Sequence, residues 1–185
     1  MRITGGEFCG RSLYAPRTLR VRPASDRFRV NIFNILGNSC EGMTALDLFA
    51  GVGTLGLEAL SRGAELVTFV DSFHQSLAFL KKNASFCKER VTIFPTDFRA
   101  ALKALSRKKC AFDLIFIDPP YEHDFVAASL RLLDNSLLLK ENGMIVVQHS
   151  RHELIPDDLK QLSVVDTRKY GDTVISFCRA RTHLQ

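Results

Sequence analysis

Four consecutive residues at the end of an apolar run carry groups that could hold an amine. Asp118-Pro119-Pro120-Tyr121 follow the run "FDLIFI". The carboxylate can accept one N–H of an exocyclic amine and the carbonyl of Pro119 can accept the other. Proline fixes φ near about −65° and donates no hydrogen bond, so the segment is stiff and its carbonyls stay free. Tyr121 could stack on an extruded base. A simple Pro-Pro turn is the alternative, but it needs neither the acid nor the tyrosine.

The second pattern is a glycine-rich loop. In "LDLFAGVGTLG", Gly51, Gly53 and Gly56 form G-x-G-x-x-G between an apolar run and an amphipathic one. Glycines let a backbone turn sharply and approach a ligand closely. Asp71 lies 20 residues beyond Gly51, at the end of the next apolar run, where an acid can accept both hydroxyls of a ribose. The pattern favours a nucleoside cofactor over a purely structural turn.

Two further acids narrow the choice of cofactor. Asp47 precedes the first glycine by four residues, at a position that is usually apolar in NAD-binding folds. An acid there resembles the first motif of S-adenosylmethionine (SAM) methyltransferases, although it could also cap a helix. Asp97 and Phe98 follow the third apolar run, where they could contact the amine and the ring of an adenine. Asp97 could equally cap the helix that follows.

The elements that must position these residues alternate along the chain. Because strands alternate with helices, we predict an α/β Rossmann-like fold with a doubly wound, mostly parallel sheet of seven strands. The last two strands, around Tyr170-Gly171-Asp172, are joined by a tight turn, so the last one is antiparallel. Ligands of such sheets bind at the carboxyl ends of the strands, where all these motifs lie. The predicted strands span 44–50, 65–71, 91–97, 112–118, 143–150 and two within 162–180; the predicted helices span 53–63, 73–87, 98–108 and 124–138.

The N-terminal part of the chain is basic. The net charge is +5, and residues 1–30 hold seven arginines against two acids: Arg2, Arg11, Arg17, Arg20, Arg22, Arg27 and Arg29 against Glu7 and Asp26. Arginine suits phosphate and stacks on bases, so RNA is favoured over a solvated face without a partner. We predict one domain overall. Residues 1–24 form a basic, RNA-facing hairpin and arm, and residues 25–185 form the catalytic domain, beginning with a helix capped by Ser25 or Asp26.

Several classes of protein and site are disfavoured. The five cysteines are odd in number and lack a CxxC pair, and the histidines lack the spacing of metal ligands, so we expect no metal. No apolar run reaches the roughly 18 residues of a membrane span, and the N-terminus lacks a secretory signal. We therefore expect a cytoplasmic protein without a membrane partner. We also expect a monomer, because the sequence shows no obvious dimerisation device.

Taken together, the motifs resemble a known family. Asp-Pro-Pro-Tyr combined with the glycine loop is similar to amino-group nucleic-acid methyltransferases of the class I SAM-dependent fold. The further segments "MRITGGEFCGRSLYAP", "RPASDRFRVNIFNIL" and "YGDT" resemble the bacterial 16S ribosomal RNA guanine-N2 methyltransferase family over nearly the whole chain. Val52, Asn31 and Asp71 depart from the family pattern. Asn31 stands where an acid is expected, which leaves the ion pairing of Arg27 or Arg29 open.

The resemblance implies a role for each motif. It places SAM against Asp47, Phe49, Gly51, Gly53, Gly56, Asp71, Asp97 and Phe98, and the target amine against Asp118, Pro119, Pro120 and Tyr121. The predicted RNA contacts are Arg11, Arg20, Arg22, Arg27 and Arg29. The predicted reaction is SAM-dependent methylation of a guanine N2 amine in 16S rRNA, either as RNA or in the assembling small subunit.

Three alternatives remain at this point. A DNA adenine-N6 methyltransferase could share the Asp-Pro-Pro-Tyr motif, but the chain shows no separate target-recognition domain. A non-catalytic RNA-binding assembly factor could keep the same fold. An NAD dehydrogenase is the least favoured, because of Asp47.

Overall fold

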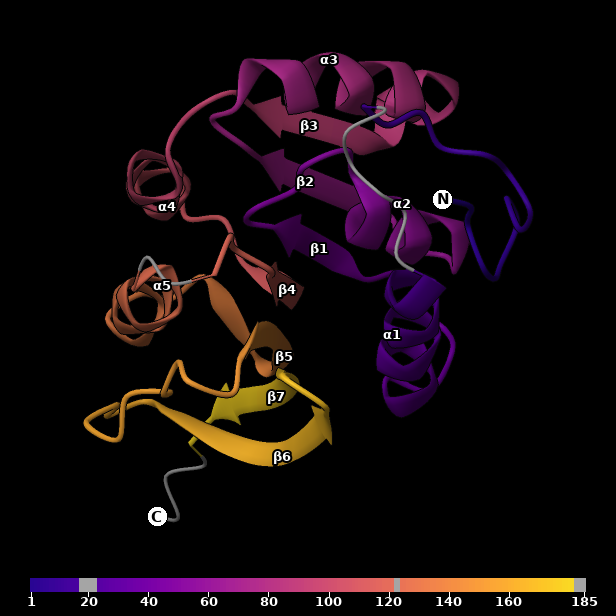
Figure 1. Ribbon diagram of the computed structural model, residues 1–185. Helices are drawn as coiled ribbons and strands as arrows, with labels where there is room; N and C mark the ends of the chain where they lie inside the picture. Colours follow the sequence, from indigo (N-terminus) through magenta and orange to yellow (C-terminus); the bar gives the residue numbers. More distant parts are fainter. Residues whose placement is uncertain (17–22, 122–123, 182–185) are drawn as a thin grey trace.

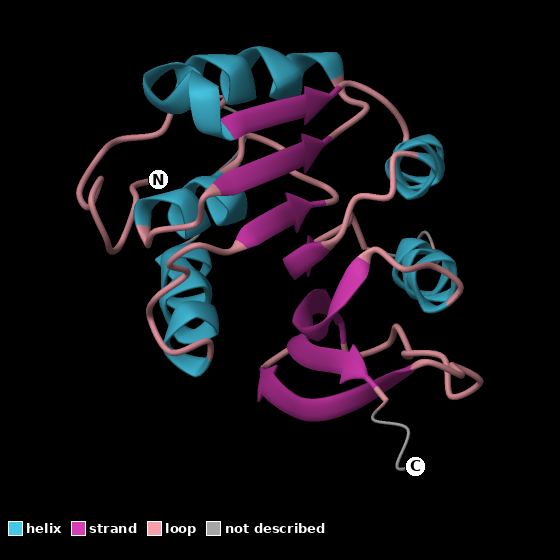
Figure 2. Ribbon diagram, turned by 180° about the vertical axis from the view of Figure 1, so that it is seen from behind, coloured by secondary structure: helices cyan, strands magenta, loops and turns pink. Residues whose placement is uncertain are grey.

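The computed structural model describes residues 1–16, 23–121 and 124–181, and in this part a central sheet carries helices on both faces (Figures 1 and 2). Its strands are β1 (Thr44–Asp47), β2 (Leu66–Val70), β3 (Val91–Phe94), β4 (Phe112–Ile117), β5 (Leu139–Ser150), β6 (Leu162–Tyr170) and β7 (Thr173–Ala180). Its helices are α1 (Pro23–Ile35), α2 (Thr54–Ser61), α3 (His74–Asn83), the 3-10 helix η1 (Ala84–Arg90), α4 (Phe98–Arg107) and α5 (Phe125–Asp134).

The strand order confirms the predicted fold class. The seven strands lie in the order β3-β2-β1-β4-β5-β7-β6, and every pairing from β3 to β5 is parallel. Strand β7 runs antiparallel to both β5 and β6, as predicted for the last strand. From β1 the chain moves outward to β2 and β3, then returns to β4 on the other side. The strand order therefore reverses between β1 and β4, which is where open α/β sheets bind ligands.

Successive side chains of a strand point to opposite faces of the sheet, so the strands contribute to two apolar cores, one on each face. In β4, Leu114 and Phe116 pack with α1, α2 and α3, whereas Ile115 and Ile117 pack with α4 and α5. Figure 1 shows α4 and α5 together on one face, opposite α1 and α2. Since both faces are covered, β1 and β4 are mostly apolar, and their polar side chains lie near the strand ends.

Three local expectations differ from the structure. The predicted N-terminal hairpin is reduced to an isolated antiparallel bridge between Arg2 and Ser12. Helix α1 begins at Pro23, so Ser25 and Asp26 lie inside the helix instead of capping it. The helix predicted over 73–87 ends at Asn83 and continues as a 3-10 helix, in which Cys87 has non-helical dihedral angles. Within the described ranges, no helix is long and apolar enough to cross a membrane.

Candidate active site

The glycine loop connects β1 to α2. It turns sharply at the carboxyl end of β1, where the strand order reverses. Gly51 and Gly53 have positive φ angles of 54° and 90°, which favour glycine. A side chain at Gly53 would also meet Leu80 Cδ1 at 2.5 Å, so the loop packs closely against α3 there. At Gly51, by contrast, an added Cβ would meet no described atom within 4 Å. The loop therefore has a packed side and an open side, and Gly51 lies on the open one.

Asp71, at the end of β2, holds this loop. Its Oδ2 accepts a hydrogen bond from the Gly51 amide at 2.6 Å, and its Oδ1 accepts one from the Phe73 amide at 2.7 Å. The carboxylate that was predicted to contact a ribose thus lies directly beside the glycine loop. An acceptor with spare lone pairs next to an open glycine suits a ligand with hydroxyl groups.

Asp47 is buried beneath the same loop, with 1% of its surface exposed. Its Oδ2 accepts a hydrogen bond from the Gly56 amide at 3.0 Å, in the first turn of α2. Burial raises the pKa of Asp47 to about 7; the Gly56 amide opposes this shift, and the charges of Asp118 and Asp71 add to it. The helix-capping alternative for Asp47 is therefore present in the structure. It also fixes the start of α2 relative to β1.

Asp97 and Phe98 are placed differently from one another. Asp97 caps α4, since its Oδ1 accepts a hydrogen bond from the Arg99 amide at 2.8 Å. Phe98 is only 3% exposed, and its ring lies 5.0 Å from Phe49 and 5.6 Å from Phe125. The Phe98 ring thus packs in the apolar core. Contact of either residue with an adenine remains a prediction.

Asp118 follows β4 at the same edge of the sheet. Its Oδ1 accepts a hydrogen bond from Gln148 Nε2 at 2.8 Å, and burial raises the pKa of its carboxyl to about 7. Pro119 is buried, whereas Pro120 is exposed. Tyr121 is 38% exposed, and its hydroxyl lies 3.4 Å from Thr173 Oγ1. The four residues thus present a carboxyl and an aromatic ring on one side of the loop.

Asp118 and Tyr121 line a cavity of about 370 Å³, which is within the size range of small-ligand sites. Its walls come from the N-terminus, α1, the start of α2, β5 and the β6–β7 turn. Two aromatic rings, Phe28 and Tyr170, meet edge to face at 5.2 Å in this lining. The remaining lining residues are Met1, Arg29, Ile32, Thr54, Leu55, Gln148, Asp172 and Thr173. The cavity thus joins Asp118 to the first turn of α2, next to the glycine loop.

Sequence reasoning assigned no role to several residues of this cavity. Gln148 gave one usable signal, since it is a polar residue near the end of the otherwise apolar run "MIVVQ". Tyr170 and Thr173 belong to the "YGDT" segment, whose place in the site was not predicted. Phe28 was predicted only to lie in the helix that begins the domain of residues 25–185. Their convergence depends on strand order, which pairs β5 with both β4 and β7.

The predicted RNA contacts are only partly described. Arg20 and Arg22, and the side chain of Arg27, lie outside the described residues. Arg11 is exposed and stacks over Phe86, with Cζ 3.8 Å from the ring centroid. Arg29 differs from the expected surface position, because it is 3% exposed and pairs with a buried carboxylate. Its burial makes it a structural support of the cavity wall.

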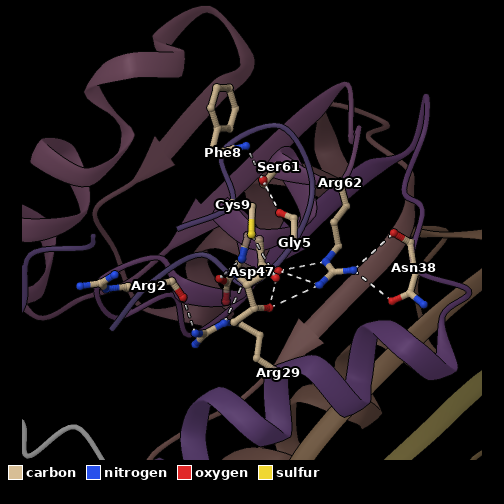
Figure 3. A network of polar contacts seen from close by, with 12 residues as sticks. Arg2, Gly5, Phe8, Cys9, Arg29, Asn38, Asp47, Ser61 and Arg62 are labelled. Atoms are coloured by element: carbon tan, nitrogen blue, oxygen red, sulfur yellow. Dashed lines mark hydrogen bonds and ion pairs between the residues drawn. The ribbon is translucent and has the colours of Figure 1, made fainter. Parts of the chain in front are cut away.

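That carboxylate belongs to Glu58 of α2, which is fully buried. Figure 3 shows the surrounding polar network, to which Arg2 of the N-terminal segment, Arg29 of α1 and Arg62 at the end of α2 belong. Glu58 pairs with Arg29 at 3.2 Å and with Arg62 at 2.9 Å, and it accepts hydrogen bonds from the amide and hydroxyl of Thr4 at 2.8 and 2.7 Å. Arg29 also donates to the carbonyl of Arg2 at 2.7 Å. Glu58 therefore supplies the acidic partner for Arg29 that the sequence left open, and it fixes the N-terminal segment and α1 against α2.

Comparisons with known proteins agree with this geometry. The model of the family described as conserved hypothetical protein 95 matches residues 1–179. YlbH of Bacillus subtilis (strain 168), named as a candidate rRNA methyltransferase, is 36% identical over 183 residues, covering 98% of this chain and 100% of that protein. Ribosomal RNA small subunit methyltransferase D of Escherichia coli (strain K12) is 31% identical over 157 residues, covering 84% and 78%.

Solved structures show the same architecture. The structure of yhhF from Escherichia coli, described as a candidate methyltransferase, superimposes with a TM-score of 0.83 at 28% identity, covering 98% of both chains. A hypothetical protein of Thermus thermophilus gives a TM-score of 0.80 at 27% identity, covering 96% of this chain and 98% of that one. The similarity thus extends over the sheet, the helices and the N-terminal segment.

Proposed function

This chain belongs to the family described as conserved hypothetical protein 95, and on that premise we propose that it methylates the exocyclic N2 amine of a guanine in 16S ribosomal RNA, with S-adenosylmethionine as the methyl donor. The match supports the family predicted from the sequence. A relative that covers most of the chain is named as a small-subunit rRNA methyltransferase, which supports rRNA as the substrate class. The choice of guanine N2 rests on the family resemblance.

The observation that carries the proposal is the position of Asp118 in the cavity. This carboxyl lines the cavity together with Thr54 and Leu55 of α2, so an amine held by Asp118 would lie close to a ligand of the glycine loop. The residues around the loop suit S-adenosylmethionine, because Gly51 leaves open space and Asp71 supplies an acceptor beside it. When bound, S-adenosylmethionine supplies an activated methyl group on a sulfonium.

The chain's own residues then position the amine. Asp118 accepts one N–H of the amine, and the carbonyl of Pro119 accepts the other, which turns the nitrogen lone pair toward the donor side. Tyr121 stacks on the base, and its place is set by the contact of its hydroxyl with Thr173. Catalysis of this kind depends mainly on proximity and orientation. After transfer, the extra proton on the nitrogen leaves to the Asp118 carboxylate or to water.

The decisive experiment is methyl transfer to unmodified small-subunit RNA, to assembling subunits and to unmethylated DNA, with the modified nucleoside identified by mass spectrometry. We expect N2-methylguanosine with the wild-type protein and none with Asp118→Ala. The control variant is Asp158→Ala, which removes an exposed carboxylate in a surface pair with Arg131. N6-methyladenine in DNA would instead support the adenine methyltransferase. If Asp118→Ala still performs the protein's function in cells, the hypothesis of a non-catalytic assembly factor would be supported.

A further inference from the structure

Gln148 is a polar residue that lines the same cavity as Asp118. The proposed catalysis by Asp118 assigns no role to it. In the parallel pairing of β4 and β5, Ile117 lies opposite Val147, so the next residues, Asp118 and Gln148, lie abreast at the sheet edge. Its neighbours Val147 and His149 are buried away from the cavity, whereas Gln148 lines it. The strand therefore directs one amide side chain to the place where the target amine is held.

The chemistry of the pair fixes which end of the amide faces Asp118. In the structure the NH₂ group faces the carboxyl, with a 2.8 Å contact from Nε2 to Oδ1, and this orientation suits the ionised form of Asp118, which only accepts hydrogen bonds. The carbonyl oxygen Oε1 is then the other end of the amide. Among the residues that the structure describes, none donates a hydrogen bond to this oxygen, and the oxygen is not a fully buried atom. Gln148 thus leaves an acceptor available at the cavity.

We propose that Gln148 determines the specificity for guanine: its Nε2 holds Asp118, and its Oε1 accepts the N1–H of the target base. The inference rests on the proposed function and adds the residue that selects the base. Guanine carries N1–H and the N2 amine side by side, so its donors match two adjacent acceptors. A base whose N1 carries a lone pair would face Gln148 Oε1 with acceptor against acceptor.

The probe that isolates this contact is 2,6-diaminopurine, placed in RNA at the position that the wild-type protein methylates. It keeps the 2-amino group but has a lone pair in place of the N1–H. Leaving an acceptor unpaired once the base covers it costs about 1–3 kcal/mol; at about 1.4 kcal/mol for each tenfold, roughly 10- to 100-fold in rate lies within that range. We therefore expect the wild-type protein to prefer guanine to 2,6-diaminopurine by about 10- to 100-fold in kcat/KM.

Two variants separate the two ends of the amide. Gln148→Leu removes the acceptor at similar size, so the preference for guanine should fall to within about threefold of unity. Gln148→Glu keeps an acceptor oxygen, so the preference should persist although the rate falls, because two carboxylates would then lie side by side. The KM for S-adenosylmethionine should stay unchanged in both, which a general loss of structure would not allow.

The outcomes distinguish the inference from the proposed function. If the wild-type protein methylates guanine and 2,6-diaminopurine equally, or if Gln148→Leu keeps the full preference, the specificity role is overturned while the methyltransferase activity stands. If the wild-type protein methylates no guanine in the RNA, the proposed function is overturned and the specificity role with it.

Discussion

Replacing Asp118 by Asn should stabilise the protein at neutral pH while it strongly slows methyl transfer. Burial raises the pKa of Asp118 from 3.8 to about 7 in the folded protein. Below pH 3.8 the carboxyl is protonated in both states and its contribution to stability is complete. As the pH rises to about 7, the unfolded chain ionises first, so stability is lost, and it levels off above that pH. An asparagine carries no charge at any of these pH values.

The size of the effect follows from the shift. A rise from 3.8 to about 7 corresponds to at most roughly 4 kcal/mol, at about 1.4 kcal/mol for each pH unit. Because Asp118 also lines an open cavity, water screens part of this cost, and we expect about 1–3 kcal/mol at pH 8. For a chain of this length, each kcal/mol moves Tm by about 2–4 °C, so the gain should be several degrees.

The loss of activity has a separate cause. Gln148 Nε2 donates to Oδ1 of Asp118, and the same contact would hold the carbonyl oxygen of an asparagine. The asparagine NH₂ would then face the target amine, donor against donor. Removing one catalytic hydrogen-bond partner in this way costs about 10²- to 10³-fold in kcat.

Thermal unfolding at pH 5 and pH 8 would measure the stability effect, and methyl transfer to RNA would measure the activity. The control is Asp158→Asn, whose carboxylate is 61% exposed and should change Tm by less than about 2 °C at both pH values. A gain for Asp118→Asn that is equal at both pH values, or a loss at pH 8, would refute the raised pKa. Full activity of the variant would refute the role of Asp118 as an acceptor.

Three further outcomes are expected. Glu58→Ala should lower the free energy of unfolding by about 3–5 kcal/mol in urea titrations, because it removes the buried carboxylate that pairs with Arg29 and Arg62, whereas the surface change Arg131→Ala should cost under about 1 kcal/mol. Gly56→Ala should cost about 1–3 kcal/mol in the same titrations, since its new methyl group would overlap the buried ring of Phe69. Asp97→Ala should lower the free energy of unfolding by about 1 kcal/mol through lost helix capping, whereas Asp97→Ser should change it very little. If the Asp97 carboxylate contacts the cofactor, both variants should bind S-adenosylhomocysteine more weakly in calorimetry.

The sheet edge that carries the proposed active site could be predicted because its signals are local. The alternation of apolar runs with amphipathic ones fixes a parallel sheet, and a parallel sheet brings every strand end to one edge. Asp47 lies within an apolar run, and Asp71 and Asp118 each end one, so their proximity follows from the fold class alone. The structure bears this out, since the charges of Asp71 and Asp118 both act on Asp47.

The boundaries of α1 and the state of Arg29 could not be predicted in the same way. Whether an arginine faces solvent or a buried carboxylate depends on which helix packs against it. Glu58 lies 29 residues away, in a helix whose own pattern gives no sign of the partner. Long-range pairing of this kind depends on packing, which the local sequence does not encode.

The sequence by itself determined the fold class and the positions of Asp118 and the glycine loop, because periodicity and motif spacing act over a few residues. Only the tertiary structure decided that Gln148 lies beside Asp118, that the β6–β7 turn forms a wall of the cavity, and that Glu58 holds the N-terminal segment. For the first two, the physical reason is the strand order. It inserts β7 between β5 and β6, and it places residues 30 positions apart within hydrogen-bonding distance.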